Sequence, residues 1–376
     1  MNSLATAAFF AFGALLVLFG ANASDIIRDL SLDYADFGLV ASMLSMGIGC
    51  GILCAGPLSD RLPRRPLFLC SVGGVAIASF WVGPATGYAT LLIVSFAIGF
   101  GAGFYETLLN TVIVEQSGTD APRRLLFIHS AATLGATVTP FAIGLLREPL
   151  SVSWYDSFHA AGSLHVALLF GLPLLPVAAR ARSNPEAHPT LPESSDGFLL
   201  GTICTVTFVY VGVESALTFF VADYAQNDLG LAPGRASGVV GFFWLGLLIG
   251  RLAIGLAPRS PSAGTTALLA SVSASVVATF FLGGSLPAEI AMLLIGFFLG
   301  GVFPIMIGLA GMTRPGATGL AVSLAAGLGS LGGFAIPWLT GILATSMNLA
   351  AALAMLSAWL LLLVIASVIV HHRHAR

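Results

Sequence analysis

Long apolar runs follow one another along nearly the whole chain, and only short polar stretches separate them. Hydrophobic residues make up 57% of the 376 residues and charged residues only 9%, whereas soluble domains carry about a quarter charged residues. So few charges cannot cover the surface of a soluble fold. A net charge of −2 without a long basic run also excludes a nucleic-acid binder. The composition therefore predicts a protein that crosses a lipid bilayer several times.

The apolar runs predict both the number of membrane spans and the division of the chain. A helix needs about 20 apolar residues to cross the bilayer core. Windows of that size predict twelve spans, at 4–27, 37–58, 66–83, 90–114, 127–146, 160–179, 198–222, 237–257, 264–283, 288–312, 317–342 and 349–370. The longest polar stretch falls between the sixth and seventh spans. We expect an all-α fold of two six-helix halves, 1–179 and 198–376, joined by a cytoplasmic linker at 180–197.

The arginines predict the orientation of these spans. Basic residues concentrate on the cytoplasmic side of membrane proteins, and all 15 basic residues here are arginine. If the N-terminus is cytoplasmic, eleven of them lie on that side: Arg61, Arg64, Arg65, Arg123, Arg124, Arg180, Arg182, Arg259, Arg314, Arg373 and Arg376. We therefore expect both termini in the cytoplasm. We also expect a monomer that spans the cell inner membrane.

The loop between spans two and three carries a compact motif, G-P-L-S-D-R-L-P-R-R at 56–65. Gly56 would let two helices approach closely. Asp60 lies at a predicted helix end, where a carboxylate can pair with a nearby cluster of arginines. Such a cluster can hold one conformation and break in another; the alternative is a basic loop that anchors the protein at the membrane surface. The candidate latch residues are Gly56, Asp60, Arg61, Arg64 and Arg65.

The second half repeats this pattern weakly. Gly250 and Gly255 in span eight have the spacing of Gly51 and Gly56 in span two. Two six-helix halves related as parallel repeats would leave such a trace.

Span four contains an ionisable residue deep in the membrane. It reads G-F-G-A-G-F-Y-E-T-L-L-N over 99–110, which places Asn110 one turn after Glu106 on the same helix face. Ionisable residues inside a membrane are costly and are functional candidates by default. Glu106 could exchange a proton and bind a hydroxylated substrate, or could make a structural bond between helices. The glycines would let another helix or a ligand approach closely.

Three further residues are weaker candidates. Glu214 in span seven is predicted slightly toward the outer side, as a ligand or as a packing contact. Arg251 is predicted near the inner end of span eight, where it could reach the membrane surface or pair with a carboxylate as part of an inner gate. His129 begins span five and is a candidate proton or substrate contact.

Several of these motifs resemble a known family. The spans, the linker and the 56–65 loop resemble the major facilitator superfamily, whose loop reads G-x-L-x-D-R-x-G-R-R. More narrowly, E-T-L-L-N at 106–110, Y-V-G-V-E at 210–214 and W-L-G-L-L-I-G-R at 244–251 are similar to segments of the fucose permeases, in the fucose–galactose–glucose:proton symporter family. This resemblance implies that Glu106 takes part in proton coupling and sugar binding. That family's second acid, midway through span one, has no counterpart at 18–22.

These observations predict a secondary active transporter. It would move a small polar solute, with a sugar as one candidate, by alternating access and proton symport. The alternative is a proton-driven exporter of drugs or metabolites. No phosphate-binding loop can form, because that motif requires a lysine. We expect no enzymatic activity, cofactor or bound metal; the expected partners are the solute, protons and the bilayer.

Overall fold

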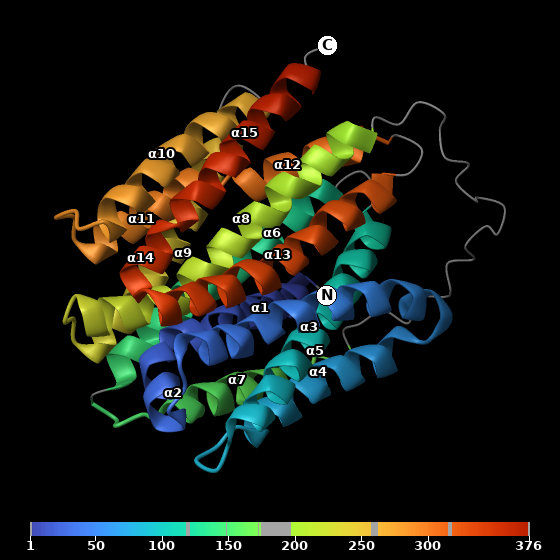
Figure 1. The fold of residues 1–376 in the computed structure, drawn as a ribbon. Helices are drawn as coiled ribbons and strands as arrows, with labels where there is room; N and C mark the ends of the chain where they lie inside the picture. Colours follow the sequence, from blue (N-terminus) through green and yellow to red (C-terminus); the bar gives the residue numbers. More distant parts are fainter. Residues whose placement is uncertain are drawn as a thin grey trace. The chain divides into compact units, whose positions relative to one another are not determined.

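The computed structural model describes residues 2–117, 121–147, 149–171, 173, 197–256, 262–314 and 318–374. In this part of the chain every regular element is a helix (Figure 1). In chain order they are α1 (Asn2–Ala21), α2 (Ala23–Leu30), α3 (Tyr34–Arg61), α4 (Arg64–Trp81), α5 (Tyr88–Ser117), α6 (Ala121–Arg147), α7 (Trp154–Leu169), α8 (Gly197–Asp223), the π-helical turn η3 (Tyr224–Asp228), α9 (Pro233–Gly255), α10 (Ala263–Phe281), α11 (Ala288–Leu299), α12 (Val302–Met312), α13 (Thr318–Ser346), α14 (Leu349–Ala354) and α15 (Leu356–His374).

Ten helical segments of the described residues are long and apolar enough to cross a membrane. They coincide with ten of the predicted spans, so a helical protein with many membrane crossings is confirmed. The predicted span 66–83 coincides with α4, whereas the span 160–179 overlaps α7 only over 160–169. α4 begins with two arginines, which lower its mean hydropathy, and α7 has only 16 residues. The number twelve and the cytoplasmic termini therefore stay predictions.

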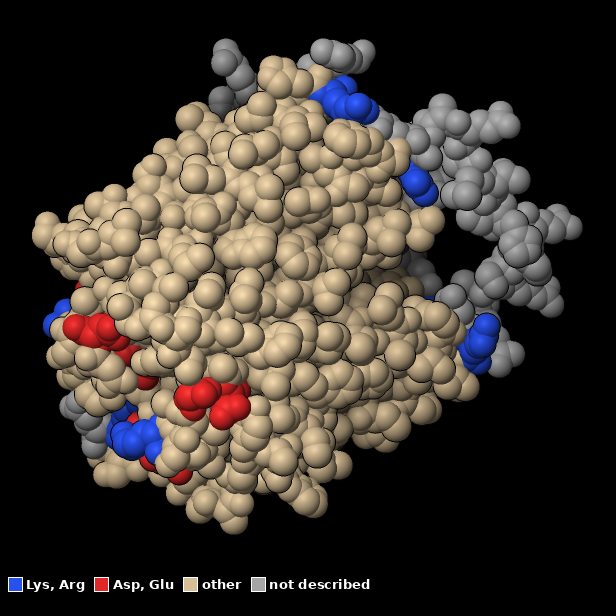
Figure 2. All heavy atoms as spheres, viewed as in Figure 1, with Lys and Arg blue, Asp and Glu red and all other residues tan. Residues whose placement is uncertain are grey.

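Few charged side chains appear on the face drawn in Figure 2, where they form separate groups and leave a broad uncharged zone. Such a zone can face lipid without burying charge.

The chain forms two compact units. Unit 1 is Met1–Ser183 with Phe219–Gly241, and unit 2 is Asn184–Thr218 with Phe242–Arg376. Both α8 and α9 are thus divided between the units. Most of the predicted linker 180–197 lies outside the described residues, and the division into six-helix halves stays a prediction.

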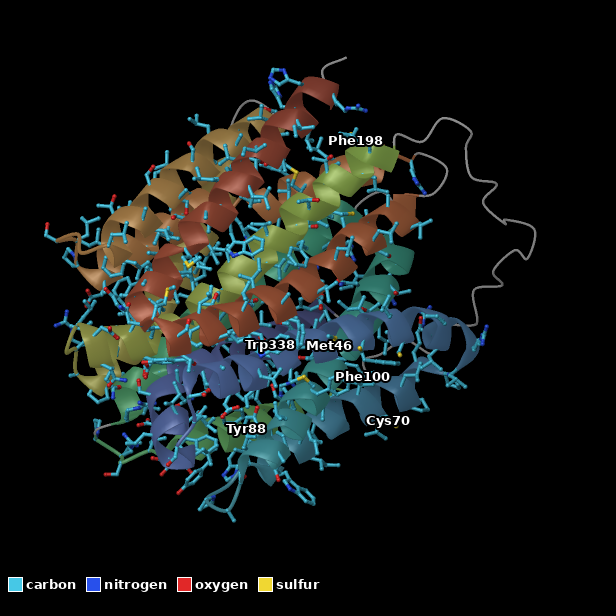
Figure 3. The ribbon with its side chains drawn as sticks, viewed as in Figure 1. Met46, Cys70, Tyr88, Phe100, Phe198 and Trp338 are labelled. Carbon is cyan, nitrogen blue, oxygen red and sulfur yellow. The ribbon has the colours of Figure 1, made fainter. Side chains whose placement is uncertain are left out.

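Glycines hold the helices of unit 1 close together. A Cβ atom added to Gly47 or Gly51 of α3 would collide with the backbone of α5, and one added to Gly99 or Gly103 of α5 would collide with α3. At Gly51, for example, the carbonyl oxygen of Phe100 occupies the space that a Cβ atom would need; the side chain of Phe100 is labelled in Figure 3. Small residues allow such close approach between membrane helices. Of the two possibilities for the span-four glycines, Gly99 and Gly103 therefore serve helix packing.

Unit 2 repeats this arrangement. The carbonyl oxygen of Phe297 in α11 occupies the space of a Cβ atom at Gly250 of α9, as that of Phe100 in α5 does at Gly51. The two helix pairs share this contact, and the repeat of one half by the other stays a prediction. The expectation for Gly56 is wrong, because a Cβ atom there would have no described atom within 4 Å. Gly56 lies in the last turns of α3.

Three predicted spans are interrupted, and the one at 349–370 divides at Met355 into α14 and α15. Span 4–27 ends with α1, because Asn22 turns its side-chain amide back onto the carbonyl oxygen of Leu18 and onto Ser157. The polar helix α2 follows. Span 288–312 consists of α11 and α12, which are separated at Gly300 and Gly301.

Candidate substrate and proton sites

Glu106 lies on α5, and its carboxyl group makes a side-chain hydrogen bond with Asn110. The prediction that these two residues share a helix face is therefore confirmed. The Oδ1 atom of Asn110 is buried and accepts no hydrogen bond from a described residue. Neighbouring polar side chains of this segment turn inward on their own helix, since Thr107 bonds the carbonyl oxygen of Gly103 at 2.9 Å. The Glu106–Asn110 pair thus keeps an acceptor for an added hydroxyl or amine.

Glu106 makes no ion pair within the described part of the chain. A charged residue near the centre of a membrane helix costs about 3 kcal/mol on insertion scales. A carboxylate at this position is stabilised only by a cation, by hydrogen bonds or by taking up a proton. Since the structure gives it one amide partner, Glu106 is suited to exchange a proton.

His129 packs against a different helix. Its ring lies edge-on to that of Phe9 in α1, with 4.8 Å between the ring centroids. The structure therefore gives His129 a packing contact between α6 and α1, and its role in proton or substrate binding stays a prediction.

Three polar side chains of unit 2 form the Tyr210 cluster, which consists of Tyr210, Glu214 and Arg251. The hydroxyl of Tyr210 donates a hydrogen bond of 2.8 Å to Oε1 of Glu214. Nη2 of Arg251 donates to the same hydroxyl at 3.2 Å and lies 3.5 Å from Oε1 of Glu214. Of the two possibilities for Arg251, pairing with a carboxylate is confirmed, while its role in a gate stays a prediction.

Glu214 and Arg251 meet although they were predicted at different depths of their spans, and helix direction explains how. α8 and α9 run in opposite directions, and side chains on a helix tilt toward its N-terminus. Glu214 therefore reaches away from the α8–α9 turn, and Arg251 reaches toward it. The two long side chains converge although their backbones lie at different depths.

A second contact fixes Arg251. Its Nε atom donates a hydrogen bond of 3.2 Å to the carbonyl oxygen of Gly300 in unit 2. In a continuous helix that carbonyl would accept from the residue four positions later, which is Pro304 and has no N–H group. Proline thus leaves a carbonyl free within the membrane, where irregular backbone must find a polar partner.

The loop at 56–65 is only partly described. The side chain of Asp60 lies outside the described residues. Nη2 of Arg65 donates a hydrogen bond of 3.3 Å to the carbonyl oxygen of Pro173. This bond ties the loop to the segment after α7, and the latch role of Gly56, Asp60, Arg61, Arg64 and Arg65 stays a prediction.

Sequence reasoning missed a charged network in unit 1. Asp25 of α2 pairs with Arg147 at the end of α6 at 2.7 Å, and both side chains are at least 85% buried. Arg147 also donates to Oδ1 of Asn22 at 2.8 Å. The two charges are far apart in the sequence, so no local pattern could have paired them.

Sequence reasoning also missed Asp223. This residue is fully buried, and its carboxylate accepts hydrogen bonds from the hydroxyl of Tyr34 at 2.9 Å and from the amide of Asn227 at 2.7 Å. The predicted span seven ends at residue 222, one residue earlier, whereas the membrane-length helix continues through η3 to Asp228. The error in the boundary placed this acid in a loop.

These helices define a polytopic membrane protein of the transporter class. One span carries a carboxyl that has no ion pair among the described residues, and a carboxyl–arginine pair joins two other spans. The comparison with known families agrees, because the model of the Major Facilitator Superfamily matches residues 4–337. The chain belongs to this superfamily of membrane transporters, which are not enzymes.

Individual relatives agree with this assignment. The glucose/mannose transporter GlcP of Bacillus subtilis is 23% identical over 89% of this chain and 85% of its own length. Among solved structures, a point mutant of the nucleoside transporter NupG is similar, with a TM-score of 0.78, 15% identity and 98% of both chains covered. FucP, a superfamily transporter solved in its outward conformation, has a TM-score of 0.67 at 18% identity, again over 98% of both chains. At these identities the solved structures support the fold alone.

Proposed function

We propose that this protein is a proton-coupled secondary transporter that imports a small polyhydroxylated solute, with a sugar as the first candidate. It has twelve spans in two six-helix halves, 1–179 and 198–376, with both termini in the cytoplasm. It works as a monomer in the cell inner membrane. The halves alternate in exposing a central site to the two sides.

The observation that carries this proposal is the environment of Glu106. It is the carboxyl of span four, it makes no ion pair among the described residues, and it is hydrogen-bonded to Asn110. A carboxyl in this setting is stabilised when it takes up a proton, because burial disfavours its charged form. This stabilisation is lost when the carboxyl moves into water. Alternate exposure of such a group to two aqueous phases moves protons down their gradient.

Asn110 supplies the link to a hydroxylated solute. Its buried Oδ1 atom accepts a hydrogen bond, and a carboxyl beside it can accept or donate according to its protonation state. A buried polar atom without a partner costs about 1–3 kcal/mol. A solute hydroxyl that donates to Oδ1 removes this cost, so solute and proton binding reinforce each other at adjacent side chains.

The solutes of two similar transporters support this substrate class. GlcP transports glucose and mannose, and NupG transports nucleosides, which carry a ribose or deoxyribose. Both kinds of solute present several hydroxyl groups on a small ring. The Tyr210 cluster then holds helices α8, α9 and α11 together and contributes to a gate, while the loop at 56–65 acts as the latch on the cytoplasmic side.

The test is solute uptake into proteoliposomes under an imposed pH gradient. Radiolabelled glucose, mannose and a nucleoside are the first probes, and a wider set of sugars and polyols is ranked by thermal stabilisation of the purified protein. The wild type should accumulate its solute when the outside is acidic. Glu106→Gln should lose this accumulation by at least about tenfold, yet keep solute exchange, which needs no net proton movement.

The matched control is Glu289→Gln, which makes the same chemical change in the first turn of α11. It should leave accumulation unchanged. If Glu106→Gln responds to the pH gradient as the wild type does, the coupling role is wrong. If an acidic outside drives the solute out of the vesicles, the protein is a proton-driven exporter and the proposed direction is wrong.

A further inference from the structure

The end of α8 belongs to unit 1, although the beginning of this helix belongs to unit 2. Residues Phe219–Gly241, which we call the hairpin, lie with unit 1. Within that unit the ring of Phe220 meets that of Phe37 edge-on at 5.6 Å. The hydroxyl of Ser237 donates a hydrogen bond of 2.7 Å to the carbonyl oxygen of Ala21. A helix shared by two compact units must bend, or leave one of them, when the units move relative to each other.

A threonine and a π-helical turn flank this part of α8. Thr218, the last residue of unit 2 in α8, bonds the carbonyl oxygen of Glu214 at 2.7 Å. Threonine bonds of this kind often bend a helix. Beyond Asp223 the helix widens into η3, and π-helical turns occur frequently at functional sites. Asp223 therefore lies where the regular α-helix gives way to the π-helical turn, five residues after the unit boundary in α8.

The carboxylate of Asp223 connects the hairpin to the rest of unit 1. It accepts hydrogen bonds from Tyr34 of α3, from Asn227 of η3 and from Ser24 of α2. All three donors are neutral, and within the described residues Asp223 makes no ion pair. A fully buried carboxylate with only neutral partners is an unusual arrangement, because buried charges are normally paired.

The ionisable groups around Asp223 do not supply the missing cation. On η3 the nearest is the carboxyl of Asp228, which has the same charge, and on α3 it is the Tyr34 hydroxyl. On α2, Asp25 pairs with Arg28 and with Arg147 of α6. The hairpin's own Arg235 is exposed.

We propose that Asp223 is a second proton-binding carboxyl of this transporter, and that its proton holds the hairpin against α1, α2 and α3. The inference rests on the proposed proton coupling, but it assigns a different residue and a different step. With the hairpin in place, Asp223 is buried without a cation, so this state favours the protonated carboxyl. When the hairpin lifts, water can solvate the charge and the proton leaves to the aqueous phase. By linkage, protonation favours the closed hairpin to the same extent.

The test measures whether the hairpin opens as the pH rises. In a background with the four native cysteines changed to alanine, Ser237→Cys provides a reporter, because Ser237 is 1% exposed while the hairpin is closed. Its reaction rate with a membrane-impermeant maleimide is divided by that of Leu229→Cys, an exposed position on the same hairpin. This ratio removes the pH dependence of the thiol itself.

The expected ratio rises at least about fivefold between acidic and alkaline pH, the lower end of typical coupling between two sites. Asp223→Asn, which resembles the protonated form, should give a low ratio that does not change with pH. Asp228→Asn, the same change five residues later, should keep the rise. Tyr34→Phe removes one hydrogen-bond donor and leaves the carboxyl. The ratio of reaction rates should therefore still rise with pH, and should reach a higher value at alkaline pH because the closed hairpin has lost one bond.

The outcomes separate this inference from the proposed function. Glu106→Gln should keep the rise in the ratio while it loses proton-driven uptake. If the ratio of reaction rates in Asp223→Asn rises with pH as it does in the parent, Asp223 is not the proton site of the hairpin. If Asp223→Asn does not fold, Tyr34→Phe decides the matter, because a profile identical to that of the parent contradicts the inference.

Discussion

The Tyr210 cluster yields the sharpest prediction, because its geometry supports an estimate of energy. Two unit charges 3.5 Å apart, as Arg251 and Glu214 are, attract each other by about 5 kcal/mol at an effective dielectric constant near 20. Removing one partner of a buried pair typically costs about 3–5 kcal/mol. Arg251 keeps its bonds to Tyr210 and Gly300, and its side chain is 24% exposed. We therefore expect Glu214→Gln to destabilise the protein by about 2–3 kcal/mol.

The assay is a double-mutant cycle of thermal unfolding in detergent, followed by intrinsic tryptophan fluorescence. An unfolding entropy of about 2 cal/mol/K per residue converts the expected loss into about 3–4 °C for a chain of this length. Arg251→Met should also destabilise, but the double variant should recover much of the loss, since neither charge is then left alone. Glu289→Gln serves as the control. A coupling energy below about 0.5 kcal/mol would show that the two residues act independently and would refute this reasoning.

The remaining predictions concern packing and the second buried ion pair. Gly250→Ala should lower stability by about 1–3 kcal/mol through a collision with the α11 backbone. Gly56→Ala should be tolerated, because its Cβ would have open space. Equal losses of thermal stability in the two variants would contradict this prediction. Arg147→Met should lower the melting temperature because it leaves a buried carboxylate alone, and Arg28→Met, at a side chain that is 65% exposed, should not change it measurably. The same unfolding assay checks both pairs.

Much of the fold could be predicted from the sequence, because a membrane imposes one length and one polarity on every span. What escaped prediction were the interruptions. Asn22 ends α1 through bonds to its own helix and to Ser157, and Pro304 interrupts span ten by leaving one carbonyl free. Both depend on where individual hydrogen bonds go, which hydropathy does not record.

The sites divide in the same way. The contact between Glu106 and Asn110 was predictable, because residues four apart on a helix are neighbours by geometry. The pairing of Glu214 with Arg251 was only partly predictable, since it needs the directions of two antiparallel helices. Asp223 was missed for another reason: its importance comes from burial against helices about 190 residues earlier in the chain.

The interruption of span ten has an electrical consequence for Arg251. A helix carries partial negative charge at its C-terminal end, and a cation there is stabilised by roughly 0.3–2 kcal/mol. Because the span is cut after Leu299, α11 places such an end inside the membrane-spanning segment, directed at the guanidinium. Arg251 therefore has a source of negative potential that does not depend on any ionisable group. Part of its stabilisation therefore remains when the Glu214 carboxylate is replaced by an amide in Glu214→Gln.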